Sequence, residues 1–348
     1  MRRHLILGCA AMAAALSWSS LASAQPRPSP AVAAAAGAPL RLTFDEGFER
    51  RPSPERWATA YKNAGPDPKS LSDRSLYGNR ERQVYFDKAF LGLGVDPFSV
   101  RGGVLTITAR PLDEKARRAV ARALDGRSEK LRRSALKDVR YSSGVLTTKG
   151  RFEQRHGYFE MRARWTGGKG LWPAFWLLPA NGAWPPEIDV VEVLGHDMRT
   201  IYQSAHSKAG GKHVGRTQKA RLEGEDASSF HTYGVLWTPG ELRFFIDGVQ
   251  TNQTPAPADA AGPMYMIVNL AVGGKWPGDP DVRTRFPARM EIDHVRAWAW
   301  GEPTDQGWTG ALRSRRVNLP ATEPARPSTS AKAARPPGKA RTADHAAP

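Results

Sequence analysis

Short runs of β-branched and aromatic residues recur through residues 40–302, and glycine, proline and aspartate separate them. Side chains in residues 158–163 alternate between two faces, which is typical of an antiparallel strand with one buried face. Residues 242–246 end at an Asp247–Gly248 pair, which favours a tight turn. Many short strands at this spacing predict an all-β fold, either a β-sandwich or a jelly roll.

Residues 112–137 interrupt this series of strands. Alanine, leucine, arginine and lysine dominate there, and residues 116–124 and 128–136 are predicted to form two short helices. An Asp125–Gly126 pair separates them. We therefore expect a small helical insertion on the surface of the β fold.

The two ends of the chain have no strand pattern. A basic start, an apolar run over residues 5–16 and an Ala22-Ser23-Ala24 exit predict a signal peptide over residues 1–24. The apolar run is too short to span a membrane, so we expect a secreted or periplasmic protein without a membrane span. Residues 25–39 are rich in proline and alanine and are interpreted as a linker. Residues 303–348 are interpreted as a disordered, basic tail.

The only cysteine, Cys9, lies within the predicted signal peptide. Cleavage would leave a chain without cysteine, so neither a disulfide nor a thiolate metal site is expected.

The formal net charge of +17 on 348 residues invites a nucleic-acid interpretation, but the charge is peripheral. Residues 1–24 contribute +2, residues 111–140 contribute +5 and residues 313–348 contribute +6, which leaves +4 for the rest. A nucleic-acid binder is expected to spread charge along its binding face. We therefore expect no nucleic-acid partner.

The clearest chemical signal is the sequence Glu-Ile-Asp-Val-Val-Glu at residues 187–192. In a strand, Glu187 and Asp189 share one face and Glu192 points away. A β-bulge at Val190 or Val191 would return Glu192 to the face of the other two acids. The alternatives are a carboxylate buried in the core, which is costly, or a solvated acidic face.

Grouped carboxylates on one face suit glycoside hydrolysis, in which one attacks the anomeric carbon and another protonates the leaving oxygen. Asp189, between the two glutamates, would hydrogen-bond to Glu187 and help to keep one glutamate protonated.

Tryptophans lie close to this motif in the sequence, and flat indoles can stack on sugar rings. They are Trp165, Trp172, Trp176, Trp184 and, further on, Trp276. Each one could instead belong to the core, and Trp176 is the strongest core candidate. Trp184 and Trp276 are flanked by proline and glycine and are expected on loops.

These motifs resemble glycoside hydrolase family 16. The resemblance rests on residues 170–178 (GLWPAFWLL) followed by 187–192, and on residues 77–83, 143–149, 230–237 and 268–274. It implies a β-jelly roll of the concanavalin or lectin type, whose concave face forms the cleft. It also implies retention, with Glu187 as nucleophile, Asp189 as assistant and Glu192 as acid/base. The extra residue in the motif is similar to the laminarinase-type branch, which favours β-1,3 or mixed β-1,3/1,4 glucan.

The resemblance also implies substrate contacts by Asn79 and Arg80, stacking by Trp172, Trp184 and Trp276, and a cleft contact by His206. His231 is interpreted as buried and structural. No cofactor is required for hydrolysis. Asp293 matches a side-chain ligand of a structural calcium ion, with backbone carbonyls near Glu46 and Gly102, and the alternative is that no metal binds.

The leading hypothesis is thus a secreted, monomeric endo-β-glucanase that acts on a polysaccharide. The alternatives are a transglycosylase on the same scaffold and a non-catalytic glucan-binding module. The basic insertion over residues 112–140 is either a solvated surface feature or a border of the cleft that favours an acidic polysaccharide, such as a bacterial exopolysaccharide.

Overall fold

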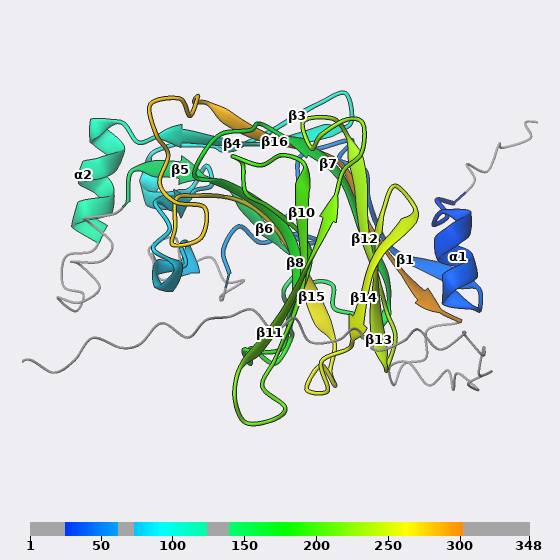
Figure 1. Ribbon diagram of the computed structural model, residues 1–348. Coiled ribbons are helices and arrows are strands. Elements are labelled where there is room, and N and C mark those ends of the chain that lie inside the picture. The colour runs from blue at the N-terminus through cyan, green and yellow to red at the C-terminus, as the bar shows by residue number, and fades with distance from the viewer. Residues whose placement is uncertain (1–24, 62–72, 124–138, 302–348) are drawn as a thin grey trace, which may run out of the picture. The chain divides into compact units, whose positions relative to one another are not determined.

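The computed structural model describes residues 25–61, 73–123 and 139–301 (Figure 1). The predicted signal peptide, the second predicted helix and the predicted tail lie outside these residues. Within the described part of the chain no helix is long and apolar enough to cross a membrane.

The described strands form two sheets, of ten and six strands, and the predicted all-β sandwich is confirmed. The ten-stranded sheet has the order β14 (Val249–Pro255), β13 (Glu241–Ile246), β12 (His231–Trp237), β7 (Gly157–Trp165), β16 (Ala288–Trp300), β4 (Val104–Pro111), β5 (Tyr141–Ser143) and β2 (Gln83–Tyr85). In addition, β1 (Leu40–Glu46) pairs with β16, and β3 (Phe98–Arg101) pairs with β4. The six-stranded sheet has the order β11 (Val214–Arg221), β10 (Thr200–Ser207), β9 (Glu187–Val193), β8 (Leu171–Pro179), β15 (Met264–Val272) and β6 (Val145–Thr147).

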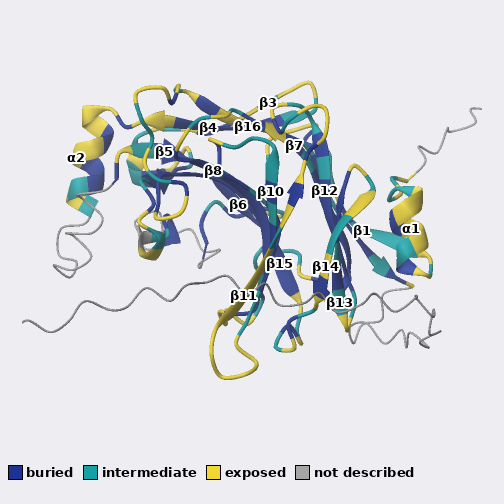
Figure 2. Cartoon of the chain, viewed as in Figure 1, coloured by how far each residue is buried: buried dark blue, intermediate teal, exposed yellow. Residues whose placement is uncertain are grey.

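The main core is shared by the two sheets. Phe159 of β7 and Phe175 and Val191 of the six-stranded sheet are fully buried in one apolar cluster. Burial of each such side chain stabilises the fold by roughly 1.5–3 kcal/mol. Figure 2 shows buried residues along β8 and β15, whereas the edge strand β11 is largely exposed. The cleft described below opens on the other face of the six-stranded sheet, away from this core.

The interpretation of residues 25–39 as a linker is wrong for residues 30–36. They form helix α1 (Pro30–Ala36), which Ser29 caps at its N-terminus and Gly37 ends in a left-handed conformation. Its buried residues Val32 and Ala36 belong to a second apolar cluster with Trp298 and Trp300 of β16. The segment is therefore docked on the ten-stranded sheet.

The first helix of the predicted insertion is present as α2 (Glu114–Ala123). Its buried residues Ala116 and Val120 belong to an apolar cluster with Phe86, Phe90 and Val139. Two short 3₁₀ helices, η2 (Tyr77–Asn79) and η3 (Phe90–Gly92), complete the helical elements of the described residues. One face of α2 is thus packed against the body, and the insertion is more than a solvated appendage.

Candidate active site

The predicted β-bulge is present in β9. Against β8, Val191 pairs with Phe175 and Asp189 pairs with Trp176, so Val190 has no partner there. Against β10, Glu192 pairs with Tyr202 and Asp189 with Ser204, and the register shifts at the same place. The extra residue returns Glu192 to the face of the other two acids.

All three acids line one cavity of about 1020 Å³ on the six-stranded sheet. Ile188, Val190 and Val191 are fully buried in the main core, on the opposite side of the strand. The sequence-based prediction that Glu187, Asp189 and Glu192 come together is therefore correct in its geometry.

Each acid has a specific partner. The indole N–H of Trp184 donates to Glu187 Oε2, and that of Trp172 donates to Glu192 Oε1 at 3.0 Å. Asp189 Oδ2 lies 3.2 Å from Nε2 of His206. Ligand-type atoms of Glu187, Asp189 and His206 all lie within 4.8 Å of one another. The acids are thus held in defined orientations.

Burial is the main electrostatic influence on two of these acids. It raises the pKa of Glu192 well above its usual range, and the charges of Asp189 and Glu187 add to this, whereas the hydrogen bond from Trp172 acts in the opposite direction. Burial also raises the pKa of Asp189, and the charge of Glu187 and a hydrogen bond with it contribute further. Glu192 therefore holds a proton to higher pH than a free glutamate does, which suits a general acid.

The predicted aromatic platform lies at the cleft. Trp172, Trp184 and Trp276 line it, and Trp184 and Trp276 are 57% and 40% exposed. The rings of Trp172 and Trp276 meet edge to face with centroids 5.4 Å apart. The ring of Tyr202 also meets that of Trp276 edge to face, with centroids 4.8 Å apart.

Trp165 and Trp176 are both buried, but only Trp165 lies wholly in the core. Trp165 is buried in the main core. Trp176 is 8% exposed but still lines the cleft, and its indole N–H donates to Asn269 at 2.7 Å.

The two histidines differ as predicted. His206 lines the cleft, whereas His231 is 8% exposed and its Nδ1 lies 2.6 Å from Asp247 Oδ2 in a structural contact.

The two predicted polar contacts in residues 77–83 differ in placement. Asn79 lines the cleft and donates to Glu81 Oε1 at 3.2 Å. Arg80 is exposed and does not line it. Its backbone has a positive φ of 58°, and its charge instead acts on Asp279. The prediction that Arg80 reaches a sugar in the cleft is therefore not supported by its position.

Three further groups in or beside the cleft were missed from the sequence. Glu81 is 2% exposed, lines the cleft, and burial raises its pKa to about 7. Asn269 joins Trp176 to the Tyr85 hydroxyl, to which it donates at 3.0 Å. His213 Nε2 lies 3.0 Å from His206 Nδ1, and its ring packs on Trp184 with centroids 4.9 Å apart. Glu81 and Asn269 lie inside motifs already recognised, whereas His213 carried no signal.

The residues at the predicted calcium position do not fit a cation. The Arg162 guanidinium donates to Asp293 Oδ2, and Asp293 Oδ1 lies 3.8 Å from His294 Nδ1. Calcium needs six to eight oxygen ligands, and a guanidinium beside the one side-chain ligand opposes its binding.

The cleft is lined by carboxylates and exposed tryptophans and lies on a β-sandwich. This combination is typical of glycoside hydrolases. Residues 114–296 match the model of glycosyl hydrolases family 16, and the chain belongs to this family.

Relatives of the chain support the same family. It is 42% identical over 226 residues to the endo-1,3-1,4-beta-glycanase ExsH of Rhizobium meliloti (strain 1021), an alignment that covers 65% of this chain and 44% of the relative. It is 30% identical over 273 residues to a beta-glucanase of Rhodothermus marinus, over 72% of this chain and 82% of the relative. The chain therefore spans less than half the length of the Rhizobium relative.

A solved structure gives the same fold. The laminarinase catalytic domain of Thermotoga maritima superimposes with a TM-score of 0.58 and 30% identity, over 76% of this chain and 99% of that domain.

Proposed function

We propose that the chain is an endo-acting β-glucanase that hydrolyses β-1,3 or mixed β-1,3/1,4 glucan with retention of configuration. The observation that carries this proposal is the bulge in β9, which gathers Glu187, Asp189 and Glu192 at one cleft. The names of the relatives, a glycanase, a beta-glucanase and a laminarinase, support the substrate class.

In the first step Glu187 attacks the anomeric carbon, and the bond to the leaving sugar oxygen breaks. Glu192 gives its proton to that oxygen, and a glycosyl ester forms on Glu187. The Trp184 N–H orients Glu187, and a hydrogen bond between Asp189 and the Glu187 carboxylate adds to this.

In the second step water replaces the leaving sugar. Glu192, now ionised, removes a proton from the water as it attacks the anomeric carbon, and the Glu187 carboxylate is released. The Trp172 N–H stabilises the ionised Glu192 between the two steps.

A non-catalytic glucan-binding module explains this arrangement less well. Such a module needs aromatic platforms, but it gains nothing from carboxylates that burial and mutual repulsion destabilise. We also propose that residues 1–24 direct the protein to the periplasm or the exterior, because their basic start, apolar run and Ala22-Ser23-Ala24 exit are typical of a signal peptide.

Digestion of laminarin and lichenan, with proton NMR of the fresh product, tests the mechanism. We expect the β anomer to appear first, and an initial α product would contradict retention. Glu187→Gln should abolish turnover and leave the melting temperature close to that of the parent protein. Appreciable activity of this variant on ordinary glucan would refute the assignment of the nucleophile.

A further inference from the structure

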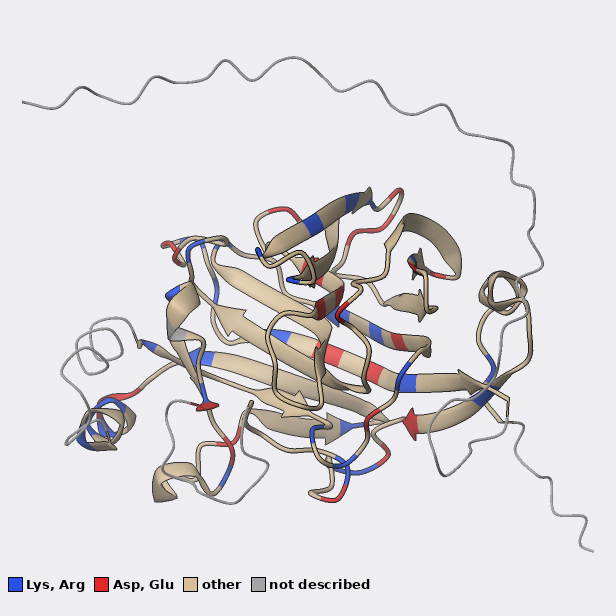
Figure 3. Ribbon diagram, turned by 90° about the horizontal axis from the view of Figure 1, so that it is seen from below, with Lys and Arg blue, Asp and Glu red and all other residues tan. Residues whose placement is uncertain are grey.

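One group of side chains in the cleft has the composition of a metal site. Figure 3 shows aspartate and glutamate on several strands and loops. Among the described residues, however, only Glu187, Asp189 and His206 bring three ligand-type atoms within 4.8 Å of one another. They lie on adjacent strands, because His206 of β10 pairs with Glu187 of β9, and Asp189 follows two positions along the same face.

The contact between Asp189 and His206 has the spacing of two metal ligands. Asp189 is 2% exposed, and its Oδ2 accepts no hydrogen bond within the described part of the chain, although His206 Nε2 lies 3.2 Å away. A tetrahedral zinc ion, with bonds of about 2.0–2.2 Å, holds its ligand atoms roughly 3.3–3.6 Å apart. A buried carboxylate oxygen without a partner is costly, and an ion between these two atoms would satisfy it.

His213 supplies the outer contact that a metal-bound histidine normally has. Its Nε2 lies 3.0 Å from His206 Nδ1. A histidine that binds a metal through one ring nitrogen usually donates a hydrogen bond from the other, which fixes the tautomer and the orientation of the ring. When His206 donates from Nδ1 to His213, its Nε2, the nitrogen beside Asp189, carries the lone pair that a cation needs.

The charge of the cleft also favours a cation. Among the described residues that line it, Lys149 alone is a lysine or arginine, and its ammonium group lies 5.4 Å from the centre of the Tyr265 ring. The same lining contains four carboxylic acids, which are Glu81, Glu187, Asp189 and Glu192. The excess of acids draws cations into the cleft.

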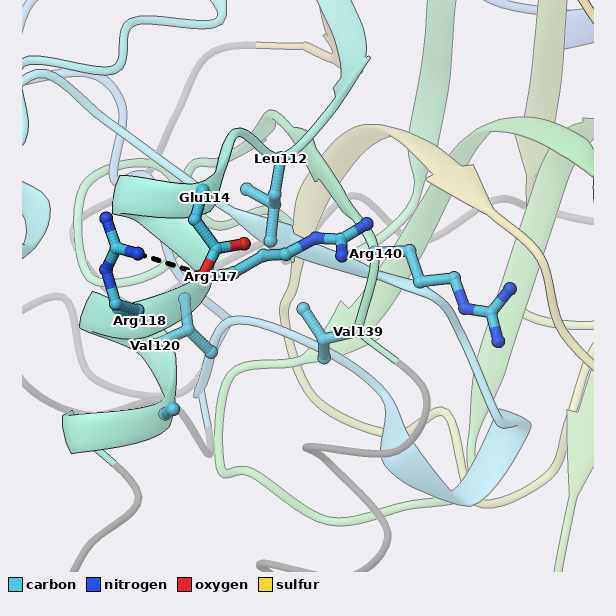
Figure 4. Close-up of a pocket in the computed structure, with 8 residues that line it drawn as sticks. Leu112, Glu114, Arg117, Arg118, Val120, Val139 and Arg140 are labelled. Atoms are coloured by element: carbon cyan, nitrogen blue, oxygen red, sulfur yellow. Dashed lines mark hydrogen bonds and ion pairs between the residues drawn. The ribbon is translucent and has the colours of Figure 1, made fainter.

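The second cavity of the molecule, of about 550 Å³ at α2, has the opposite character. Arg117, Arg118 and Arg140 line it (Figure 4), and Glu114 is the one acid among its described lining residues. That acid already pairs with Arg118 at 3.1 Å. A metal cation is therefore directed to the cleft and repelled from the cavity at α2.

We propose that Glu187, Asp189 and His206 bind one divalent transition-metal ion of the Zn²⁺ type, and that this ion reversibly inhibits the enzyme. Two carboxylates and an imidazole suit zinc or copper, whereas calcium and magnesium prefer oxygen ligands alone. Rotation of the flexible Glu187 side chain brings its carboxylate to the ion. Glu187 and His206 are only half-buried, so the ion can enter from the cleft.

Inhibition follows because the ion binds the nucleophile. A Glu187 carboxylate that coordinates a metal cannot attack the anomeric carbon, and the ion occupies the place of the reacting sugar. Binding of the ion and of glucan is therefore mutually exclusive. The inhibition rests on the proposed glucanase function, whereas the binding of the ion does not.

The binding test is a calorimetric titration of the full chain, freed of metals, with Zn²⁺. We expect His213→Ala, which removes only the outer contact, to weaken the tightest site about tenfold, and His206→Gln, which removes a ligand, to weaken it about a hundredfold. His213 is exposed, so its variant tests the site even if His206→Gln does not fold. The matched control is His196→Ala, which removes an exposed histidine that does not line the cleft and should leave the affinity unchanged. An equal zinc affinity in the wild type and in both test variants would overturn the inference.

The activity test uses laminarin with the wild-type protein. At a zinc concentration about ten times its Kd, the apparent KM should rise about elevenfold at nearly constant kcat, since exclusive binding reduces the free enzyme by that factor. Removal of zinc with EDTA should restore the original KM. Zinc bound at this site without any rise in KM would overturn the inhibitory role. A wild-type protein that is inactive on glucan even without zinc would contradict the proposed function instead, and the titration would still decide whether the ion binds.

Discussion

The hydrogen bond between Trp172 and Glu192 offers a direct test of the acid/base assignment. The indole N–H donates to Glu192 Oε1 at 3.0 Å, and the same ring contacts Trp276. Trp172→Phe keeps an aromatic ring in the cleft and removes the N–H donor together with the pyrrole part of the indole. The substitution therefore separates the hydrogen bond from most of the sugar platform.

The sign of the effect follows from which form of Glu192 the bond stabilises. Burial and the charges of Asp189 and Glu187 raise the pKa of Glu192, and the Trp172 N–H opposes this by stabilising the carboxylate. A hydrogen bond to a charged group contributes about 1.5–3 kcal/mol. Loss of this hydrogen bond should raise the pKa of Glu192 still further, because the affinity of the Glu192 carboxylate for a proton then rises about tenfold or more.

Since the general acid works in its protonated form, the variant should stay active to higher pH. The basic limb of the profile of kcat/KM against pH, which reports on the free enzyme, is expected to move upward by about one pH unit or more. Trp184→Phe is the matched control, because the Trp184 N–H bonds to Glu187, and it should leave this limb in place. A limb that stays in place or moves downward in Trp172→Phe would refute the role of Glu192.

Two further variants probe other contacts of the cleft. Glu192→Gln should lose less activity on an aryl glycoside with a good leaving group than on glucan, because only glucan needs protonation; equal losses on both substrates would count against Glu192 as the acid. His213→Ala removes the partner of His206 Nδ1 and should lower kcat/KM about twofold to tenfold, at nearly constant melting temperature, since one hydrogen bond contributes about 0.5–1.5 kcal/mol. Its control is the neighbouring Lys212→Ala, and an equal loss there would show that only the hairpin matters.

The sequence alone was sufficient to predict those features that depend on the alternation of side chains along a single strand. The strand pattern predicted the all-β fold, and the spacing of Glu187, Asp189 and Glu192 predicted the bulge at Val190 and Val191, because a buried unpaired carboxylate is costly. These arguments need only the period of a strand and the chemistry of the side chains.

Helix α1 could not be predicted in the same way. Its sequence, PAVAAAA, is short and apolar between prolines and a glycine, and so resembles a linker. What fixes it is distant in sequence: the Trp300 indole donates to the Ala36 carbonyl at 3.2 Å, and the Trp298 indole donates to the Pro26 carbonyl at 3.2 Å. Only the tertiary fold brings these partners together.

The sequence could not test the predicted calcium site for the same reason. A match at Asp293 identifies a carboxylate but does not reveal its neighbours. The register of β7 and β16 places Arg162 opposite His294, next to Asp293, and the guanidinium then pairs with that carboxylate. Cross-strand register, which the sequence does not give, decides whether the oxygen is free for a metal.

The contact between His206 and His213 is a further consequence of register. His206 pairs with Gly215 across the β10–β11 hairpin. A Cβ atom at Gly215 would lie 2.9 Å from His206 Nδ1, so the glycine leaves room for the imidazole. The hairpin then returns His213 to within hydrogen-bond distance of that same nitrogen.

The bulge itself changes the core more than the cleft. On β10 the partners of Glu187, Asp189 and Glu192 are His206, Ser204 and Tyr202, which are evenly spaced at two-residue intervals. The three acids therefore occupy successive positions on one face, as they would in an unbulged Glu-x-Asp-x-Glu strand. The extra residue is absorbed on the opposite side, where Val190 and Val191 are both fully buried. This explains how a longer motif can present the same carboxylates to a substrate. The bulge adds apolar volume to the core and leaves unchanged the spacing of the cross-strand positions that carry the acids.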